Sequence, residues 1–398
     1  MSRLTTPICI VGAGPAGSTL ALFLAQMKIP HVLVEKASFP RDKVCGDGLT
    51  LEVMHTLREI SPKVWEQFLR HPAFKPCWGV QAIGPNGTAV HIDFDPIVHP
   101  FSPLYTGKRK NFDYFLWEQL DLSVTQRYPL TQVRHIERIG QSCLLTLKPN
   151  PHKLTEIKAD IVIGADGSSS IVARSLGEIL SAKASSFGIG IRGYAHHAPH
   201  QQVETMNFHF LEKLLPGYFW SFPLNDEELN MGIYLPADWR EKNTCSLPEV
   251  LDQLAATYPI KNKRGARLSL DQIRTWGLPL NVQPRKLAGP NYLLLGDAGA
   301  LIEPFTGKGI GMAMVSAKVA AQYLKKGYEG KITFSRALLD YDKAMKRMYQ
   351  GEYRISRYLY RAFAYTPVIN TAAWFFSRNI INQLSQKNLQ KEILKWQY

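Results

Sequence analysis

The apolar and polar positions divide the start of the chain into short strands and helices. Apolar runs at 7–11 and 31–35 are typical of buried strands, and the segment between them, 18–27, has the character of a buried helix. A strand, a helix and a second strand in this order form a βαβ unit with parallel pairing and a right-handed crossover. The pattern therefore predicts a parallel sheet at the N-terminus.

Later segments change to a period of two. Residues 77–106 are β-like, with Pro-Asn-Gly at 85–87 predicting a hairpin turn. Residues 185–235 alternate aromatic and polar positions, which is typical of antiparallel sheet. Further strands are predicted within 130–163, 265–280 and 292–295. Helices are predicted over 51–70, 112–120, 247–258, 310–326 and nearly everything after residue 333.

This order of elements predicts an α/β fold in which β-rich insertions split a Rossmann-type nucleotide-binding domain. The predicted boundaries follow from the changes of period. The discontinuous nucleotide-binding domain takes residues 1–75, 105–180 and 285–330, the antiparallel-sheet substrate domain takes 76–104 and 181–284, and a helical basic and aromatic cap takes 331–398.

Composition excludes several classes of protein. With 398 residues, 45% hydrophobic and 20% charged, the chain is globular rather than disordered. Its five cysteines are odd in number and far apart, which argues against a disulfide framework and favours a reducing compartment. Residues 7–27 carry no charge, but four Gly and Pro residues interrupt them, so we expect neither a signal peptide nor a spanning helix there. A cytoplasmic protein is expected.

A glycine-rich turn lies between the first predicted strand and helix. Gly-Ala-Gly-Pro-Ala-Gly at 12–17 fits the GxGxxG pattern. Gly12 allows the tight turn, Gly14 lets the backbone approach a pyrophosphate, and Gly17 permits close contact between helix and strand. Glu35 ends the second strand, where a carboxylate binds ribose hydroxyls and disfavours a 2′-phosphate. These residues predict a dinucleotide site.

The same pattern occurs again at 188–193, which shows how weak it is alone. There it lies in period-two alternation and no helix follows. Those glycines are therefore predicted to belong to a twisted strand.

Two further segments favour FAD over NAD. Apolar strands end in Gly-Ala-Asp-Gly at 164–167 and in Gly-Asp-Ala-Gly at 296–299, where a carboxylate can take a ribityl hydroxyl. Pro-Phe-Thr-Gly-Lys-Gly-Ile at 304–310 then makes a glycine-rich turn into a helix. The N–H groups of such a turn can stabilise negative charge at the N1–C2=O edge of a flavin.

The chain resembles the FAD-dependent oxidoreductases of the para-hydroxybenzoate hydroxylase superfamily over residues 7–330. Within it, Phe-Pro-Arg-Asp-Lys-Val-Cys-Gly-Asp-Gly-Leu at 39–49 resembles a loop of geranylgeranyl reductases, and Gly-Tyr-Phe-Trp-Ser-Phe-Pro at 217–223 resembles their YxWxFP substrate motif. Arg-Lys-Asn-Phe-Asp at 109–113 fits an R-x-x-F-D signature near the cofactor. The resemblance implies a Rossmann-type FAD-binding domain with an interleaved substrate domain.

The motifs and the resemblance together define the candidate site. Cys45, Gly46 and Asp47 are expected near the flavin ring as catalytic positions, although a buried cysteine is often only a small hydrophobe. Tyr218, Trp220 and Phe222, followed by Pro223, form either an aromatic wall for an apolar substrate or ordinary sheet core. The candidate FAD-binding residues are Gly12, Gly14, Ala16, Gly17, Glu35, Lys36, Arg41, Arg109, Asp166, Gly167, Gly296, Asp297, Pro304, Gly307, Lys308, Gly309 and Ile310.

One position departs from the reductase pattern. Reductases commonly have Gly-Glu-Gly where this chain has Gly307-Lys308-Gly309. A lysine beside the flavin would stabilise the reduced anionic cofactor, or it would point to solvent.

The positive charge concentrates at the C-terminus. The net charge of the chain is +14, and residues 331–398 contribute +8, from twelve Lys and Arg against four acids. The uncharged stretch 362–377 contains Pro367 and is flanked by arginines, so it suits either a peripheral contact with the inner membrane face or a helical cap. No nucleic-acid motif accompanies the charge, and no nucleic-acid partner is expected. His-His-x-x-His at 196–200 lacks acidic partners nearby, and no metal is expected.

The function that these residues favour is a geranylgeranyl-reductase-like enzyme that reduces C=C bonds of an isoprenoid or similar apolar small molecule by hydride transfer from reduced flavin. Electrons would come transiently from NAD(P)H or from a reduced donor protein. The alternative is a flavin-dependent halogenase or aromatic hydroxylase that acts through a C4a-hydroperoxide. A third class, a flavin-binding or membrane-interacting protein without catalysis, stays open to experiment.

Overall fold

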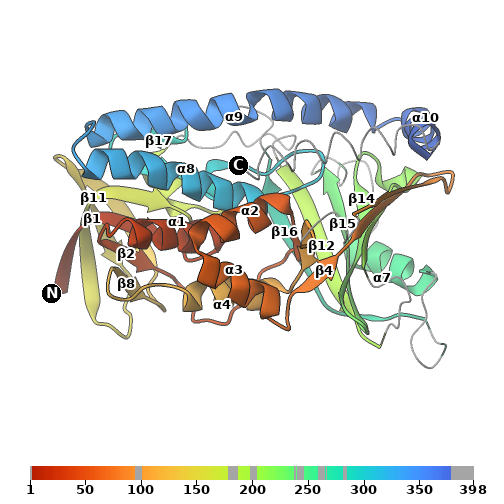
Figure 1. The fold of residues 1–398 in the computed structure, drawn as a ribbon, viewed down its shortest axis with the longest axis horizontal. Helices are drawn as coiled ribbons and strands as arrows, with labels where there is room; N and C mark the ends of the chain where they lie inside the picture. The colour runs from red at the N-terminus through yellow and green to blue at the C-terminus, as the bar shows by residue number, and fades with distance from the viewer. Residues whose placement is uncertain are drawn as a thin grey trace.

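The computed structural model of the chain describes residues 2–94, 101–177, 187–197, 204–236, 239, 246–258, 265, 267–280 and 285–377. Two large sheets lie side by side along the long axis of the molecule, and helices cover them (Figure 1).

The apolar runs form the parallel part of an eight-stranded sheet. Its main path, in the order β17-β18-β11-β1-β2-β8, is antiparallel only at the β17 end, and β10 and β9 extend it beside β11. The strands are β1 (Ser2–Val11), β2 (His31–Val34), β8 (Thr125–Tyr128), β9 (Val133–Ile139), β10 (Ser142–Leu147), β11 (Leu154–Gly164), β17 (Ala288–Gly289) and β18 (Tyr292–Leu294).

Both faces of this sheet are buried, which explains the continuous apolar runs. Ile8 and Ile10 of β1 pack into a core with the helices on one face, whereas Cys9 and Val11 belong to a second core on the other. The helices of the first face are α1 (Pro15–Gln26), α2 (Leu51–Ile60), α3 (Pro62–Arg70), α4 (Arg109–Glu118) and α8 (Ile310–Tyr328), and α5 (Ile171–Leu176) covers the second.

The second sheet has seven strands in the order β16-β12-β15-β14-β13-β5-β6. They are β5 (Gly79–Ile83), β6 (Ala89–Asp93), β12 (Phe187–Ala195), β13 (Thr205–His209), β14 (Tyr218–Asn225), β15 (Glu228–Pro236) and β16 (Leu270–Pro279). The pairing is antiparallel except between β13 and β5. The hairpin predicted at 85–87 joins β5 to β6, and the second GxGxxG match lies inside β12, as predicted.

Alternation gives this sheet two different faces. Phe219, Met231 and Ile233 pack against α7 (Leu247–Thr257) on one face. Tyr218, Trp220 and Phe222 point to the opposite face and form a separate cluster. A three-stranded sheet of β3 (Gly48–Leu49), β7 (Leu104–Thr106) and β4 (Lys75–Cys77) contacts β14, and η2 (Glu212–Leu214) precedes that strand.

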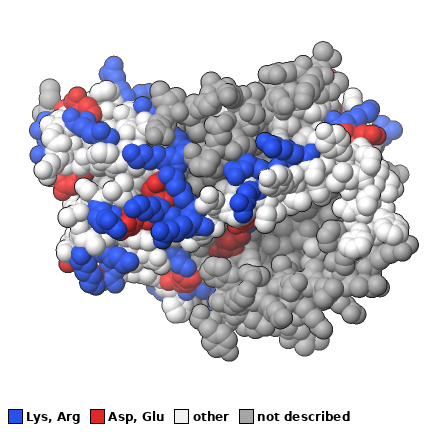
Figure 2. Space-filling view, turned by 90° about the horizontal axis from the view of Figure 1, so that it is seen from above, with Lys and Arg blue, Asp and Glu red and all other residues white. Residues whose placement is uncertain are grey.

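The C-terminal helices connect the two sheets. α9 (Phe334–Ala362) packs on α8 and β17 and runs along the top of the molecule to α10 (Thr366–Ser377), which contacts β6 at the far end (Figure 1). Lys and Arg side chains gather on the face that carries α9 (Figure 2). None of the helices in the described ranges is both long and apolar enough to cross a membrane.

One sequence prediction about helices was wrong in detail. The helix predicted over 51–70 is two helices, because Ser61 is extended and its Oγ caps the second one at the Val64 N–H, with Pro62 in the first turn. Pro367, inside the uncharged stretch 362–377, lies in the first turn of α10, where a missing N–H costs nothing.

A buried ion pair fastens the second sheet to the loop after β2. Arg192 of β12 is fully buried, and its Nη2 lies 2.9 and 2.7 Å from the two carboxylate oxygens of Asp42. Its guanidinium also lies 4.1 Å from the centre of the Tyr194 ring. The loop that carries the predicted catalytic residues is therefore held by the second sheet.

We expect R192M to lower the free energy of unfolding by about 3 kcal/mol, because it leaves Asp42 without its buried partner. R3M is the matched control, since it removes the exposed ion pair between Arg3 and Glu156, and its expected loss is below about 1 kcal/mol. Urea denaturation measures both values. Equal losses in the two variants would contradict a special role for the Arg192–Asp42 pair.

Candidate active site

One large cavity lies between the two sheets. Its volume is about 1170 Å³, more than the roughly 300–1,000 Å³ usual for a pocket that holds one small molecule. It runs from the carboxyl ends of β1 and β11 to the aromatic face of β14. Ligands of open α/β sheets bind at this end of the strands. The space accommodates a cofactor and a second ligand together.

Each glycine of the first motif has a distinct steric reason. Gly12 has a φ of +97°, and a Cβ there would lie 2.5 Å from the Ala165 oxygen. A Cβ on Gly17 would lie 1.9 Å from the Gly12 oxygen, so helix and turn touch directly. A Cβ on Gly14, in contrast, would meet only the Arg41 guanidinium at 3.6 Å. Glycine at 14 therefore leaves the start of α1 open to the cavity, which fits a pyrophosphate.

Charged side chains beside this turn form a closed network. The Glu35 carboxylate is buried, accepts the Ala13 N–H at 2.8 Å, and lies 3.6 Å from Arg41. Arg41 also donates to Asp113 at 3.0 Å, and Arg109 donates twice to the same carboxylate at 2.7 and 2.8 Å. Because both arginines have carboxylate partners, their charges are largely balanced.

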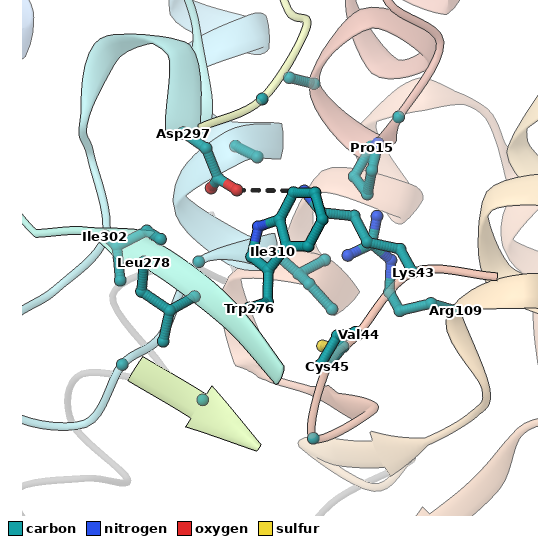
Figure 3. Close-up of a pocket in the computed structure, with 18 of the residues that line it drawn as sticks. Pro15, Lys43, Val44, Cys45, Arg109, Trp276, Leu278, Asp297, Ile302 and Ile310 are labelled. Carbon is teal, nitrogen blue, oxygen red and sulfur yellow. Dashed lines mark hydrogen bonds and ion pairs between the residues drawn. The ribbon is translucent and has the colours of Figure 1, made fainter. Parts of the chain in front are cut away.

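The two predicted ribityl aspartates differ in their surroundings. The Asp166 carboxylate accepts from the Ser170 hydroxyl at 2.5 Å and the Ile171 N–H at 2.6 Å, so it caps α5. Burial raises the pKa of Asp166. Asp297, in η3 (Gly296–Gly299), lines the cavity and pairs with Lys43 across it at 3.1 Å (Figure 3).

The loop at 303–309 is held in place by side chains on both sides. Glu303 accepts the N–H groups of Phe305 and Thr306 at 2.8 and 2.7 Å. From the second sheet, Tyr218 donates to the Thr306 carbonyl, and Tyr234 donates to the Pro304 carbonyl at 2.7 Å. The loop that would hold the flavin edge is thus fastened by hydrogen bonds from both sides without any ligand.

The lysine at 308 does not stand alone beside the cavity. Its Nζ lies 2.5 Å from a carboxylate oxygen of Glu52 in α2 and 3.6 Å from Glu352 in α9. Burial opposes the charge, but these carboxylates raise the pKa of Lys308. The ammonium therefore links the flavin loop to α2 and α9, and its charge is neutralised there.

The three predicted catalytic positions separate into two groups. Cys45 and Gly46 line the cavity, whereas Asp47 is fully buried behind them with a φ of +61°. Asp47 accepts from the Arg109 N–H at 3.0 Å, the Tyr194 hydroxyl at 2.9 Å and the Asn230 amide at 2.8 Å. Burial raises the pKa of the Cys45 thiol. Asp47 therefore holds the loop, and Cys45 faces the ligand space.

Aromatic side chains of β14 form part of the cavity wall. Tyr218, Trp220 and Phe222 all line it, while Pro223 lies outside the lining. The polar atom of each amphipathic ring is used inside the protein, since Trp220 Nε1 donates to Asn230 at 2.8 Å and the Tyr218 hydroxyl binds Thr306. A Cβ on Gly46 would lie 3.3 Å from the Phe222 ring, so the strand also packs on the Cys45 loop.

The structure brings most of the predicted site residues to one cavity. Gly17, Asp47, Gly296, Pro304 and Pro223 are the predicted residues outside its lining. Residues that sequence reasoning missed are Asp42, Lys43, Glu52, Asn230, Trp276 and Glu303. Asp42 and Lys43 lie inside the recognised 39–49 loop, whereas the others belong to segments without a motif.

Within the described ranges, no group of His, Cys, Asp or Glu side chains has an arrangement that could hold a metal. The expectation that no acidic partner lies near the histidines at 196–200 was wrong for His196, which lies 3.1 Å from Glu228 and 3.2 Å from Asp271. His200, which the sequence pattern included, lies outside the described residues.

The fold and the cavity define a flavoprotein, and comparison with known families agrees. A family described as FAD binding domain matches residues 5–351, and the chain belongs to it. The protein is therefore an FAD-dependent oxidoreductase, which confirms the predicted cofactor and fold class.

Individual relatives show which kinds of flavoprotein the chain is similar to. The menaquinone reductase of Mycolicibacterium smegmatis is 27% identical over 87% of this chain and 80% of its own length. Digeranylgeranylglycerophospholipid reductase 1 of Methanothermobacter thermautotrophicus is 28% identical over 88% and 84%. The structure of a geranylgeranyl bacteriochlorophyll reductase-like protein from Thermoplasma acidophilum superimposes with a TM-score of 0.82, at 21% identity over 95% of this chain and 92% of the other.

The proteins that the chain is similar to also include a halogenase. The tryptophan 2-halogenase of Chondromyces crocatus is 26% identical over 88% of this chain and 66% of its own length. Similarity to known proteins therefore does not decide between reduction and halogenation, and the residues of the site have to be considered.

Because of Asp47, the free energy of unfolding should fall as the pH rises, which is opposite to the usual effect of a carboxyl group. Burial raises the pKa of Asp47 from 3.8 to about 6, against the three hydrogen bonds that favour its charged form. Between these values the folded protein keeps a proton that the unfolded chain has lost. This carboxyl therefore removes about 3 kcal/mol of stability as the pH rises from about 4 to above 6.

We expect D47N to lack this decline, although the amide disturbs the donors around it and lowers stability overall. Urea denaturation at pH 4 and pH 7 measures the free energy of unfolding of wild type and variant. The difference between the two proteins should shrink by about 3 kcal/mol toward pH 7. D93N, on an exposed carboxylate of β6, is the control. A wild-type-minus-D47N difference that stays constant with pH would show that Asp47 is ionised throughout.

Proposed function

We propose that this flavoprotein reduces carbon–carbon double bonds in an isoprenoid or similarly long apolar molecule. The observation that carries the proposal is the aromatic end of the cavity, which Tyr218, Trp220 and Phe222 line while the Tyr218 hydroxyl and Trp220 indole N–H are used inside the protein. An apolar chain loses no hydrogen bonds in such surroundings, whereas a phenol or an indole would need a partner for its polar atom.

The lysines of the cavity also favour reduction over halogenation. A halogenase passes the oxidised halogen to a lysine that faces the substrate. Here the loop that Tyr218 binds carries Lys308, whose ammonium is committed to Glu52, whereas Lys36 and Lys43 line the cofactor side of the cavity.

Bound and reduced, FAD supplies a hydride equivalent, and the protein must position the acceptor and supply a proton. An isolated alkene accepts hydride poorly, so alignment of the chain against the aromatic strand contributes much of the rate. Cys45 faces the same space as a neutral thiol, because burial raises its pKa, and we assign it the position beside the reacting carbons. The electrons are proposed to come from a transiently bound NAD(P)H or a reduced donor protein.

Anaerobic reoxidation of the photoreduced holoprotein tests the proposal. We expect a polyprenyl quinone or a geranylgeranyl lipid to reoxidise the flavin, with a product mass gain of about two per reduced bond. Oxygen with halide and an aryl substrate forms the comparison arm. Indifference to prenyl chains together with halogenated or hydroxylated product would replace the reductase by the rival class, and flavin binding without either turnover would favour a non-catalytic protein.

The C-terminal helices support a further proposal, a peripheral contact with an anionic membrane surface that supplies the apolar substrate. Exposed side chains follow one another from the end of α9 into α10, with Ile355 at 61%, Tyr358 at 65% and Tyr365 at 66% exposure. Exposed Arg354 and Arg361 lie among them. Apolar and aromatic side chains with interspersed arginines suit the interface of an anionic bilayer.

We expect the protein to sediment with phosphatidylglycerol-containing vesicles and less with pure phosphatidylcholine vesicles. R354E/R361E should reduce this binding severalfold, because it reverses the charge at the aromatic end of α9. R336E/K343E makes the same charge change at the other end of the helix and is the control. Equal effects of the two double variants would mean that only the net charge matters, and the tail would then be a helical cap.

A further inference from the structure

The ammonium group of Lys43 crosses the cofactor side of the cavity. Lys43 comes from the loop after β2, and its Nζ lies 3.1 Å from Asp297, which follows β18 (Figure 3). A Cβ on Gly167, which follows β11, would lie only 3.6 Å from the same atom. The ammonium therefore sits over the carboxyl ends of two neighbouring parallel strands, where an extended cofactor has to pass.

Trp276 covers Lys43 from the second sheet. It lies on β16, its ring centre is 5.8 Å from Lys43 Nζ, and it lines the cavity. Its indole Nε1 is buried and has no hydrogen-bond partner within the described part of the chain. A buried indole N–H normally has an acceptor, so this donor points to a ligand.

The balance of charge at the glycine turn indicates which group of a ligand Lys43 can bind. Arg41 and Arg109 share the buried Asp113 carboxylate, and Arg41 also lies beside Glu35. These two cations are therefore already compensated by two carboxylates. A diphosphate that enters the cavity needs a further cation, and Lys43 is held by a single carboxylate.

We propose that Lys43 and Trp276 are FAD-binding residues that close the cofactor channel from the side of the second sheet. On binding, the Lys43 ammonium exchanges Asp297 for the FAD diphosphate, and Asp297 becomes available to a ribityl hydroxyl. The Trp276 N–H donates to an oxygen of the same cofactor. The cofactor thereby binds both sheets at once. The proposal rests on FAD binding and not on the reductase activity.

The dissociation constant of FAD tests this assignment, measured from flavin fluorescence on dilution of the holoprotein at 50 and 500 mM salt. We expect K43M to raise the constant about tenfold and to remove most of its salt dependence, because the lost contact is ionic. K43R should retain the salt dependence. K318M is the matched control, since the Lys318 side chain has nearly the same exposure as that of Lys43, 24% against 23%, and pairs with Glu59.

The W276F variant adds a spectroscopic measurement. We expect severalfold weaker FAD binding and a smaller fraction of tryptophan emission quenched by FAD, because one of the two described tryptophans that line the cavity is gone. W65F, in the aromatic cluster of α3, should change neither quantity.

If K43M has the same dissociation constant and salt dependence as K318M, the role of Lys43 is overturned. It is also overturned if K43M, relative to K318M, loses as much free energy of unfolding as it loses free energy of FAD binding. W276F with unchanged quenching and affinity would overturn the role of Trp276. Either result is distinct from failure of the reductase proposal, since no substrate is present in these measurements.

Discussion

The site depends on one buried carboxylate, Asp47, behind the loop that faces the ligand space. Its oxygens accept three hydrogen bonds, from the loop's neighbour Arg109 and from Tyr194 and Asn230 of the second sheet. Asn230 also binds the Cys45 carbonyl at 2.9 Å and the Trp220 indole at 2.8 Å. One polar cluster thus sets the distance between the thiol and the aromatic wall. Such a cluster specifies geometry strongly, because a broken member leaves an unsatisfied buried group.

A similar arrangement, with polar atoms bound to other protein groups, is found elsewhere around the cavity. Several polar atoms of its wall bind other protein groups: Tyr218 and Tyr234 fix the loop at 303–309, and Lys308 ties that loop to α2 and α9. What remains toward the ligand is apolar at one end and rich in backbone and charge at the other. The polarity of the cavity therefore changes along its length in the order that a dinucleotide cofactor followed by an apolar chain requires.

Sequence reasoning predicted what periodicity and local stereochemistry determine. The βαβ unit, the glycine turn and the alternation on β14 followed from short-range patterns, and the structure has each of them. It did not predict that Asp166 caps a helix, that Asp47 points away from the cavity, or that Lys308 pairs with Glu52. The outcomes at Asp47 and Lys308 depend on partners 62 to 256 residues away, which no local pattern contains. Trp276 was missed for the same reason. The cap at Asp166 is local, since its partners Ser170 and Ile171 follow within five residues, and it was overlooked because the aspartate was assigned to the cofactor.

The discontinuity of the first sheet has a consequence for the newly made chain. β1 and β2 are made early, but β18 and the flavin loop follow almost 300 residues later. At roughly 5–20 residues per second, this interval lasts about 15–60 s. During that time the glycine turn exists without Asp297 or the loop at 303–309, and the apolar edge of β1 lacks its neighbour β11 for about half of the interval. Cofactor capture therefore belongs to the end of synthesis, and the nascent chain must keep its first strands from pairing with other chains until then.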